Sequence, residues 1–270
     1  MIRGAHNGEV VLDVRDVRLS LGGAPVLDGV TFSLVDRIRE GTTTGQIASL
    51  LGPSGVGKTR LLRLLAGLDT PDRGTIAGIG GRPVASGQVG LVFQDYPLLE
   101  HRTVLGNLEL AGAIGGLGAE RRERARELLE LVGLSHRAGF YPAQLSGGQR
   151  QRAAIAQQMM VPRRLLLLDE PFSGIDPAAL RAVTKLITDV ANEHQLNTVV
   201  IVTHDVRAAL AVSDTVVLLG RKRDSRGRRG GATVAATYDL VDLGVAWGEH
   251  EGTRDLAAIE REIDDRFAEL

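Results

Sequence analysis

The chain has 270 residues, 43% of them hydrophobic and 24% charged, with a formal net charge of −1. This composition is typical of a globular chain long enough for one large α/β domain or two small lobes. The near-zero charge gives no electrostatic support for binding nucleic acid or an anionic membrane. The absence of cysteine excludes a disulfide scaffold and a cysteine-ligated metal site, and it is compatible with a reducing compartment. No signal-peptide core and no apolar run near ~18 residues is found, so we expect a cytoplasmic protein.

The amino-terminal third predicts a β-hairpin. Residues 9–21 and 30–35 alternate apolar and polar side chains, and the turn residues Gly22, Gly23, Ala24 and Pro25 lie between them. Such alternation indicates two strands with one buried face. Residues 36–45 are polar and are expected to form a surface loop.

A glycine-rich loop follows, between an expected strand at 47–51 and an expected helix at 61–66. The loop has the pattern G-x-x-x-x-G-K-[ST] and consists of Gly52, Pro53, Ser54, Gly55, Val56, Gly57, Lys58 and Thr59. Its backbone N–H groups would surround phosphate oxygens, and the helix that starts at Gly57 would point its positive end at the same anion. Lys58 can reach the outer phosphates and the Thr59 hydroxyl can ligate Mg²⁺. A glycine turn with a chance lysine is the alternative, and the strand-loop-helix context argues against it.

The middle of the chain is expected to be helical. Short strands are predicted at 75–77 and 89–93, the second ending at Gln94. Residues 119–132 have apolar side chains at helical spacing, which predicts a surface amphipathic helix. Ser146 and Gln149 have the spacing of a capping box, so a helix is expected to start there and to run to about Met160.

Buried strands and helices then alternate. Four leucines at 165–168 predict a strand buried on both faces, followed by Asp169 and Glu170. A helix is expected from Asp176-Pro177 to about His194, and a strand at 198–202 precedes His204. This alternation predicts a parallel sheet, and ligands bind at the carboxyl ends of such strands. Five side chains are expected to converge there: Lys58, Gln94, Asp169, Glu170 and His204.

After a short helix and a strand at 215–219, residues 221–231 carry six basic side chains and one acid. A solvated hairpin tip is favoured over a lipid or nucleic-acid contact. A strand is expected at 233–238. The final helix, from Thr253, carries an apolar stripe that we expect to dock on its own domain. The stripe consists of Leu256, Ile259, Ile263 and Phe267.

The two acids after the leucines have distinct expected roles. Asp169 can hold Mg²⁺, commonly through water, and Glu170 can polarise a water that attacks a γ-phosphate. An apolar run that ends in two acids is a weak signal alone, but together with the phosphate loop it becomes strong.

At Leu145-Ser146-Gly147-Gly148-Gln149 the chain resembles the ATP-binding cassette (ABC) ATPases, whose signature motif this is. Gln94 stands where that family has its Q-loop, residues 173–176 its D-loop and His204 its switch histidine. The resemblance covers about residues 9–220. It implies an α/β P-loop NTPase fold with a parallel RecA-like core, an antiparallel β subdomain and a helical signature subdomain at about 97–160. Residues 221–270 would form a short carboxyl-terminal extension with the basic loop, a strand and the terminal helix.

The resemblance also implies a mechanism of ATP hydrolysis. Two copies of the chain would form a head-to-tail dimer, with each ATP between the phosphate loop of one copy and the signature of the other, formed by Ser146, Gly147, Gly148 and Gln149. Mg²⁺ would be held by Thr59, Gln94 and, through water, Asp169. Glu170 would be the catalytic base, His204 would contact the γ-phosphate, and Lys58 would act on the phosphates. The alternatives are an ordinary strand-end histidine at 204 and a surface amide at 94.

Three positions depart from the family pattern. Leu21 stands where the family has an aromatic residue that stacks on adenine, so apolar contact would replace stacking. The loop at 36–45 is longer than the family's short link. His101 stands where a proline is common.

A single cassette without a membrane span resembles the importer-type subunits. These lie peripherally on the cytoplasmic face of the membrane and work with separate transmembrane permease subunits and a solute-binding protein. The pattern is most similar to the nitrate, sulfonate and taurine group. The permease would dock on the helical lobe, with Tyr96, Leu98, Leu99 and His101 as candidates, although these side chains can equally pack within the lobe.

Two other functions have less support from the sequence. A soluble cassette ATPase acting on nucleic acid or the ribosome would carry a long coiled coil or a second cassette, and this chain has neither. No nucleic-acid partner is therefore expected. A subunit that binds ATP without hydrolysis is disfavoured by the presence of Glu170 and His204.

Overall fold

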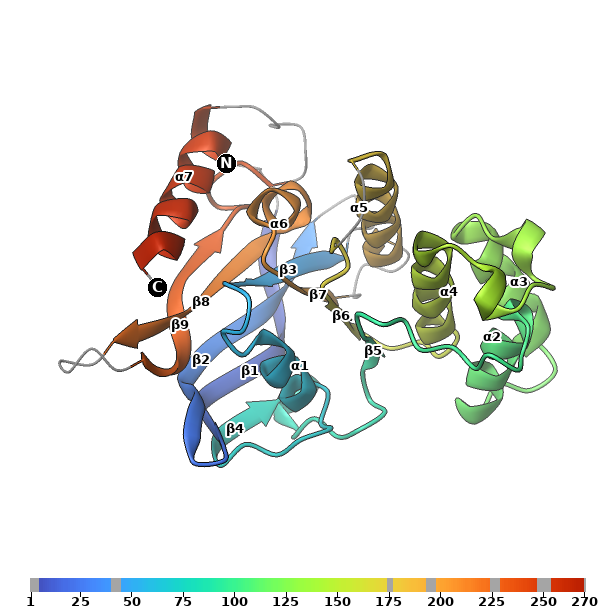
Figure 1. The fold of residues 1–270 in the computed structure, drawn as a ribbon, viewed down its shortest axis with the longest axis horizontal. Helices are drawn as coiled ribbons and strands as arrows, with labels where there is room; N and C mark the ends of the chain where they lie inside the picture. The colour runs from blue at the N-terminus through green and yellow to red at the C-terminus, as the bar shows by residue number, and fades with distance from the viewer. Residues whose placement is uncertain are drawn as a thin grey trace.

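The computed structural model describes residues 5–39, 45–173, 177–192, 198–223, 229–246 and 254–269. Within these residues the strands form one nine-stranded sheet with the order β4-β1-β2-β9-β8-β3-β7-β6-β5. A helical lobe lies at the β5 end and a long hairpin at the other (Figure 1). The strands are β1 (Ala5–Leu21), β2 (Ala24–Arg39), β3 (Gln46–Leu51), β4 (Arg73–Ala77), β5 (Gly90–Val92), β6 (Leu165–Asp169), β7 (Thr198–Thr203), β8 (Thr215–Arg223) and β9 (Arg229–Asp239). The helices are α1 (Lys58–Leu65), α2 (Val104–Ile114), α3 (Arg121–Leu131), α4 (Gly147–Met159), α5 (Pro177–Asn192), α6 (Val206–Val212) and α7 (Arg254–Glu269), with 3₁₀ turns at Ile79–Gly81, Ser135–Arg137 and Pro142–Gln144.

The core of the sheet is parallel, as the alternation of strands and helices predicts. Strands β8, β3, β7, β6 and β5 pair in parallel in that order. Every residue of β3, β6 and β7 is buried, which is why these strands are continuous apolar runs in the sequence. Their carboxyl ends therefore share one edge, and the expected site residues follow those ends.

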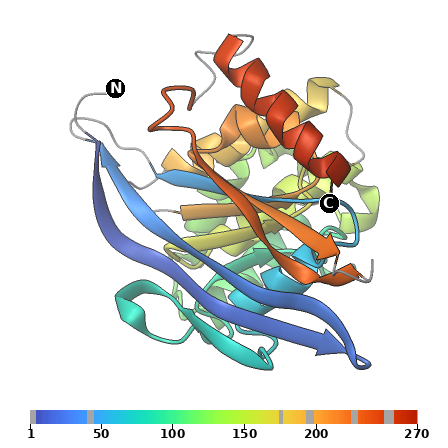
Figure 2. The same ribbon diagram turned by 90° about the vertical axis from the view of Figure 1, so that its left-hand side faces the viewer.

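The predicted amino-terminal hairpin is confirmed, and it is longer than predicted. Figure 2 shows β1 and β2 as a long twisted ribbon with β4 along its outer side. The prediction of a surface loop at 36–45 is wrong for its first residues, because Asp36–Arg39 continue β2 by pairing with β1. Asp36 is 1% exposed, and its carboxylate lies 3.6 Å from the Arg164 guanidinium. Residues 40–44 lie outside the described residues.

Strand β9 closes the gap between the parallel core and the hairpin. It is antiparallel to β8 and meets β2 through a parallel bridge between Ala232 and Leu27. The expected domain boundary at residue 220 falls inside β8, so the carboxyl-terminal extension completes the sheet. The tip of the basic run, residues 224–228, lies outside the described residues.

Helix α7 docks on its own domain, as the apolar stripe predicts. Ile263 is fully buried in a cluster with Val206 and Leu210 of α6 and Tyr238 of β9. The other stripe residues pack around this cluster. A hydrogen bond from the Tyr238 hydroxyl to Glu262 (3.0 Å) adds a polar contact.

We expect Ile263→Ala to lower the free energy of unfolding by ~2–4 kcal/mol, because it leaves a cavity in a fully buried cluster. Urea denaturation measures the change. Asp265→Ala, on the exposed side of the same helix, is the matched control and should change stability by no more than ~0.5 kcal/mol. Equal stability of the Ile263 variant and the wild type would mean that α7 is not part of the cooperative fold.

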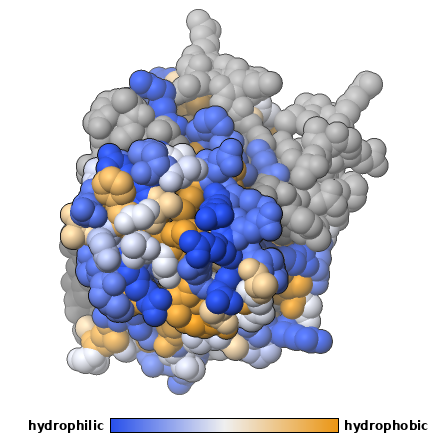
Figure 3. All heavy atoms as spheres, turned by 90° about the vertical axis from the view of Figure 1, so that its right-hand side faces the viewer, coloured by the Kyte–Doolittle hydropathy of each residue, from blue (hydrophilic) through white to orange (hydrophobic). Residues whose placement is uncertain are grey.

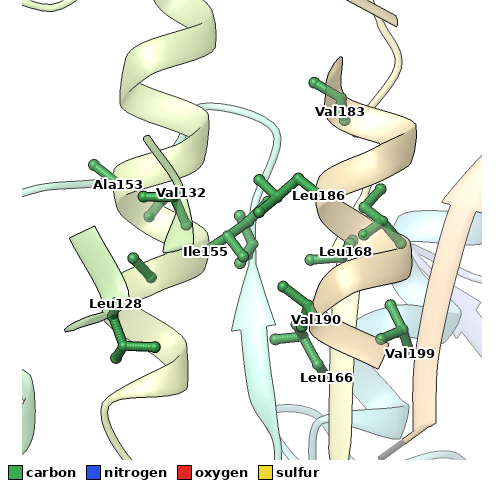
Figure 4. Close-up of a cluster of buried hydrophobic side chains, with 14 of the residues drawn as sticks. Leu128, Val132, Ala153, Ile155, Leu166, Leu168, Val183, Leu186, Val190 and Val199 are labelled. Atoms are coloured by element: carbon green, nitrogen blue, oxygen red, sulfur yellow. The ribbon is translucent and has the colours of Figure 1, made fainter. Parts of the chain in front are cut away.

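The helical lobe is joined to the parallel core by an apolar interface. The predicted amphipathic helix at 119–132 is α3, and its Ala125, Leu128 and Leu129 are buried. In Figure 4, Ile155 of α4 and Leu186 of α5 point toward each other, and Leu166 and Leu168 of β6 belong to the same buried cluster. Among the described residues, we find no helix with the length and apolar character that crossing a bilayer requires.

Candidate functional site

The glycine-rich loop leaves β3 and leads into α1, as predicted. Gly57 is the residue before the first turn of α1 and has φ +123°, and Gly55 has φ +77°. Both conformations favour glycine. A Cβ at Gly52 would lie 2.8 Å from the Leu219 carbonyl oxygen, so only glycine allows this approach. The loop is therefore held in a shape that its sequence specifies.

Lys58 is folded over this loop. Its side chain is buried, and its Nζ donates hydrogen bonds to the carbonyl oxygens of Gly52 (2.8 Å) and Pro53 (3.2 Å). The same Nζ lies 3.2 Å from Glu170 Oε1. The ammonium group thus stands between the loop and the acids at the end of β6.

Asp169 ends β6 beside Thr59. The Thr59 hydroxyl donates to Asp169 Oδ1 at 3.3 Å. Burial raises the pKa of Asp169 above its ordinary value; the Thr59 hydrogen bond opposes this, while the Glu170 charge adds to it. A hydroxyl and a carboxylate side by side fit Mg²⁺, which prefers oxygen ligands and commonly takes one or two carboxylates with substrate phosphates. Among the described residues we find no cluster of three or more His, Cys, Asp or Glu side chains that could hold a metal ion.

Glu170 links Lys58 to His204. Its Oε2 lies 2.9 Å from His204 Nδ1, while its Oε1 faces Lys58. Glu170 has φ +48°, which is unusual for a residue with a side chain and indicates local strain. Its N–H donates to the Val202 carbonyl of β7 (2.8 Å), which helps to hold this conformation. The predicted convergence is therefore observed for Lys58, Asp169, Glu170 and His204, with Thr59 beside them.

Gln94 is placed differently from these five. It is exposed in the turn after β5, and within the described part of the chain it forms no hydrogen bond to Thr59 or Asp169. Tyr96 lies two residues further on, and burial, followed by the negative charge of Asp169, raises the pKa of its hydroxyl to about 12. Sequence reasoning missed this electrostatic influence, for which the sequence carries no signal.

The docking candidates divide between the lobe and the surface. Leu98 is 8% exposed and packs, with part of Tyr96, into the lobe core. Leu99 and His101 are exposed. Asn107, fully buried, holds this segment by hydrogen bonds to the backbone of Leu99 and of Arg102 and Thr103.

The signature motif forms the amino terminus of α4, and the predicted capping box is confirmed. Ser146 Oγ accepts from the Gln149 N–H (3.3 Å), and Gln149 Oε1 accepts from the Ser146 N–H (3.0 Å). A Cβ at Gly147 or Gly148 would meet no atom within 4 Å, so the backbone there is open to an approaching group. No hydrogen bond or ion pair among the described residues joins 146–149 to the loop 52–59, and α4 lies beyond β5 from α1 (Figure 1).

Two further residues contact the site, and a third, Leu21, is predicted to lie near it. Leu21 ends β1 and is 44% exposed. Ser173 donates its N–H to the Glu170 carbonyl (3.2 Å), while residues 174–176 of the expected D-loop lie outside the described residues. Arg221, expected in a solvated tip, instead contacts the glycine-rich loop.

Known proteins resemble this chain in sequence and in structure. The ABC transporter family profile matches residues 35–173. An aliphatic sulfonates import ATP-binding protein of Burkholderia ambifaria is 39% identical over 259 residues, which is 90% of this chain and 78% of that protein. A sulfate/thiosulfate import ATP-binding protein of Bradyrhizobium diazoefficiens is 39% identical over 224 residues, 79% of this chain and 62% of that protein. This chain thus spans less than two thirds of the second relative.

Among solved structures, a dimeric ATP-binding cassette in a post-hydrolysis state, bound to ADP and Pi, superposes with a TM-score of 0.68 at 28% identity. The superposition covers 85% of this chain and 98% of that one. The family profile covers more than half of this chain, and the Burkholderia ambifaria relative is 39% identical over 90% of it. The chain belongs to the ABC transporter family.

Proposed function

We propose that this chain is the ATP-hydrolysing subunit of a membrane importer for a small sulfur-containing oxyanion. The observation that carries the proposal is the position of Glu170, between Lys58 and His204 and beside Asp169 at the carboxyl edge of the parallel sheet. A carboxylate held there can act as base toward water while a lysine and a histidine contact the phosphates.

Each side chain would have one role in that reaction. The backbone N–H groups of the loop bind the phosphates, and Lys58 exchanges its contacts with Gly52, Pro53 and Glu170 for phosphate oxygens. Thr59 and Asp169 would hold Mg²⁺, with Gln94 as a further ligand. The ion would neutralise charge on the β- and γ-phosphate oxygens. Glu170, released by Lys58, orients the attacking water.

The signature motif supports the head-to-tail dimer. Its helix amino terminus is open at Gly147 and Gly148, and such a terminus is suited to an anion. Because this motif makes no contact with the glycine-rich loop among the described residues, its phosphate is best supplied by a second copy of the chain. The cassette that was solved with ADP and Pi is itself dimeric, which agrees with this proposal.

The partners follow from the relatives. Import ATP-binding proteins imply separate transmembrane permease subunits, a peripheral place on the cytoplasmic face of the membrane and a solute-binding protein. The face of the helical lobe in Figure 3 is mostly hydrophilic with hydrophobic patches between the hydrophilic residues, which suits a reversible protein contact. The exposed Leu99 and His101, on the segment held by Asn107, are the residues we place at the permease contact.

The relatives' names favour sulfate, thiosulfate or an aliphatic sulfonate as the transported solute. Co-purification of the permease and reconstitution of the complex in liposomes test this. We expect a sulfonate or sulfate with the solute-binding protein to stimulate ATP hydrolysis, and a neutral sugar to have no effect. Full activity without any membrane partner, unaffected by these anions, would refute the importer proposal.

A soluble cassette ATPase that acts on nucleic acid has less support. In the continuously described stretch from 45 to 173, the helices between α1 and α4 are only 11 residues each. This leaves no coiled coil of the kind that a repair protein requires. Added DNA or RNA is expected to leave ATP hydrolysis unchanged.

We expect Leu21→Tyr to tighten ATP binding about five-fold, because stacking an aromatic ring on a base contributes ~1 kcal/mol or more. Leu21 is already solvent-accessible, so the ring needs no core rearrangement. A fluorescence titration measures the Kd. Leu243→Tyr, at another exposed leucine, is the control. If the Leu21→Tyr variant binds ATP no more tightly than the wild type does, adenine does not bind beside residue 21.

A further inference from the structure

We infer that Arg221 is a positioning residue for the phosphate loop, clamping its outer side so that its N–H groups stay directed at the nucleotide. The inference rests on the proposed ATP site. It concerns the first residue of the basic run, which lies on β8 beside the loop.

Arg221 makes two hydrogen bonds to the phosphate loop. Arg221 Nη2 donates to the carbonyl oxygen of Gly55 (3.2 Å), and its Nε donates to that of Val56 (3.3 Å). The N–H of the first peptide group, that of Val56, donates to the Pro53 carbonyl oxygen within the loop (3.2 Å). The N–H of the second peptide group is that of Gly57, at the start of α1, where we propose that phosphate binds. The planar guanidinium suits such a paired contact, which a lysine ammonium does not reproduce.

Strand pairing fixes the backbone of Arg221 beside the phosphate loop. Arg221 pairs with Ala232 of β9, Ala232 is fully buried, and it bridges to Leu27 of β2. Leu27 in turn approaches Gly57, whose Cβ would lie 3.2 Å from the Leu27 side chain. Strands β8 and β2 therefore both contact the phosphate loop, and β9 joins these two strands to each other. Arg221 supplies the side-chain hydrogen bonds from β8 to the loop.

A second contact fixes the other end of the loop against the same strand. Gly52 abuts the Leu219 backbone, two residues before Arg221. Strand β8 therefore supports the loop at its first glycine and at its middle. The guanidinium also places a positive charge beside a site for a polyanion, and that charge attracts phosphate even without direct contact.

The experiment compares Arg221→Met, Arg221→Gln and Arg221→Lys with the wild type. For the methionine variant we expect about a ten-fold rise in KM for ATP and in Kd for ADP, with kcat at saturating ATP within about two-fold. Lysine, which restores the charge and a single donor nitrogen in place of two, should recover part of the loss, and glutamine less. Amide hydrogen exchange at residues 53–57 should rise in the methionine variant while β3 stays protected.

Arg122→Gln removes an equally positive but distant and exposed charge from α3 and should leave all these values unchanged. A folded Arg221→Met protein with wild-type KM and wild-type exchange at 53–57 would overturn the inference. So would a loss confined to kcat, because that would place Arg221 outside nucleotide binding. Failure of the wild type to bind ATP would instead refute the proposed function, so the two failures are distinguishable.

Discussion

Glu170→Gln is expected to lower kcat for ATP hydrolysis by ~10²–10⁴-fold, the range that general-base catalysis contributes. Glutamine has the same shape and can still accept a hydrogen bond from Lys58, but it cannot take a proton from water. ATP binding should persist or tighten, because Lys58 no longer has to leave a charged partner at 3.2 Å in order to reach the phosphates. Single-turnover kinetics and an ATP titration measure the two effects.

The same variant should accumulate the closed dimer. With ATP bound and no turnover, the two copies are expected to stay associated, and sedimentation should show a dimer in ATP and a monomer in ADP. Glu127→Gln, on the exposed face of α3, is the matched control and should behave as the wild type does. Retention of full activity by Glu170→Gln would remove the role assigned to Glu170.

Much of the site could be predicted because its information is local. The shape of the phosphate loop depends on glycines at 52, 55 and 57, and the amino terminus of α4 depends on Ser146 and Gln149 three residues apart. The buried strands β6 and β7 are continuous apolar runs. Once the sheet is parallel, the convergence of Asp169, Glu170 and His204 follows from chain geometry.

What could not be predicted depends on contacts between distant segments. Asp36 is buried because β2 runs on beside the start of β1 and because Arg164 lies near it. Nothing in the local pattern of residues 36–39 distinguishes this from a polar loop. The contact of Arg221 with Gly55 depends on how β8 passes the loop, and its basic neighbours in sequence conceal it. In both cases the sequence pattern places a charged side chain in solvent although the fold gives it a partner.

Removing the charge of Asp169 is expected to make the protein more stable and less active. Asp169→Asn should raise the thermal stability of the nucleotide-free protein at pH 7.5, because burial raises the pKa of this carboxyl and the charged form is therefore disfavoured by the fold. Asparagine keeps an oxygen that can accept from Thr59. The same change should lower ATP turnover by ~10²-fold or more and raise the Mg²⁺ concentration that half-saturates the reaction, since the carboxylate ligand is lost.

The pH dependence gives the sharper test. Because the folded-state pKa of Asp169 is raised, the folded protein binds this proton more tightly than the unfolded chain does. The destabilisation that the ionised Asp169 carboxylate causes is therefore absent below the pKa of the unfolded chain, near 3.8. It is present in full above the pKa of the folded protein. The Tm advantage of Asp169→Asn over the wild type should shrink as the pH falls toward 4. Asp265→Asn, at an exposed carboxyl of α7, should show no advantage at any pH. A lower Tm for Asp169→Asn at pH 7.5 would mean that the ionised carboxylate stabilises the fold and that burial does not dominate its energy.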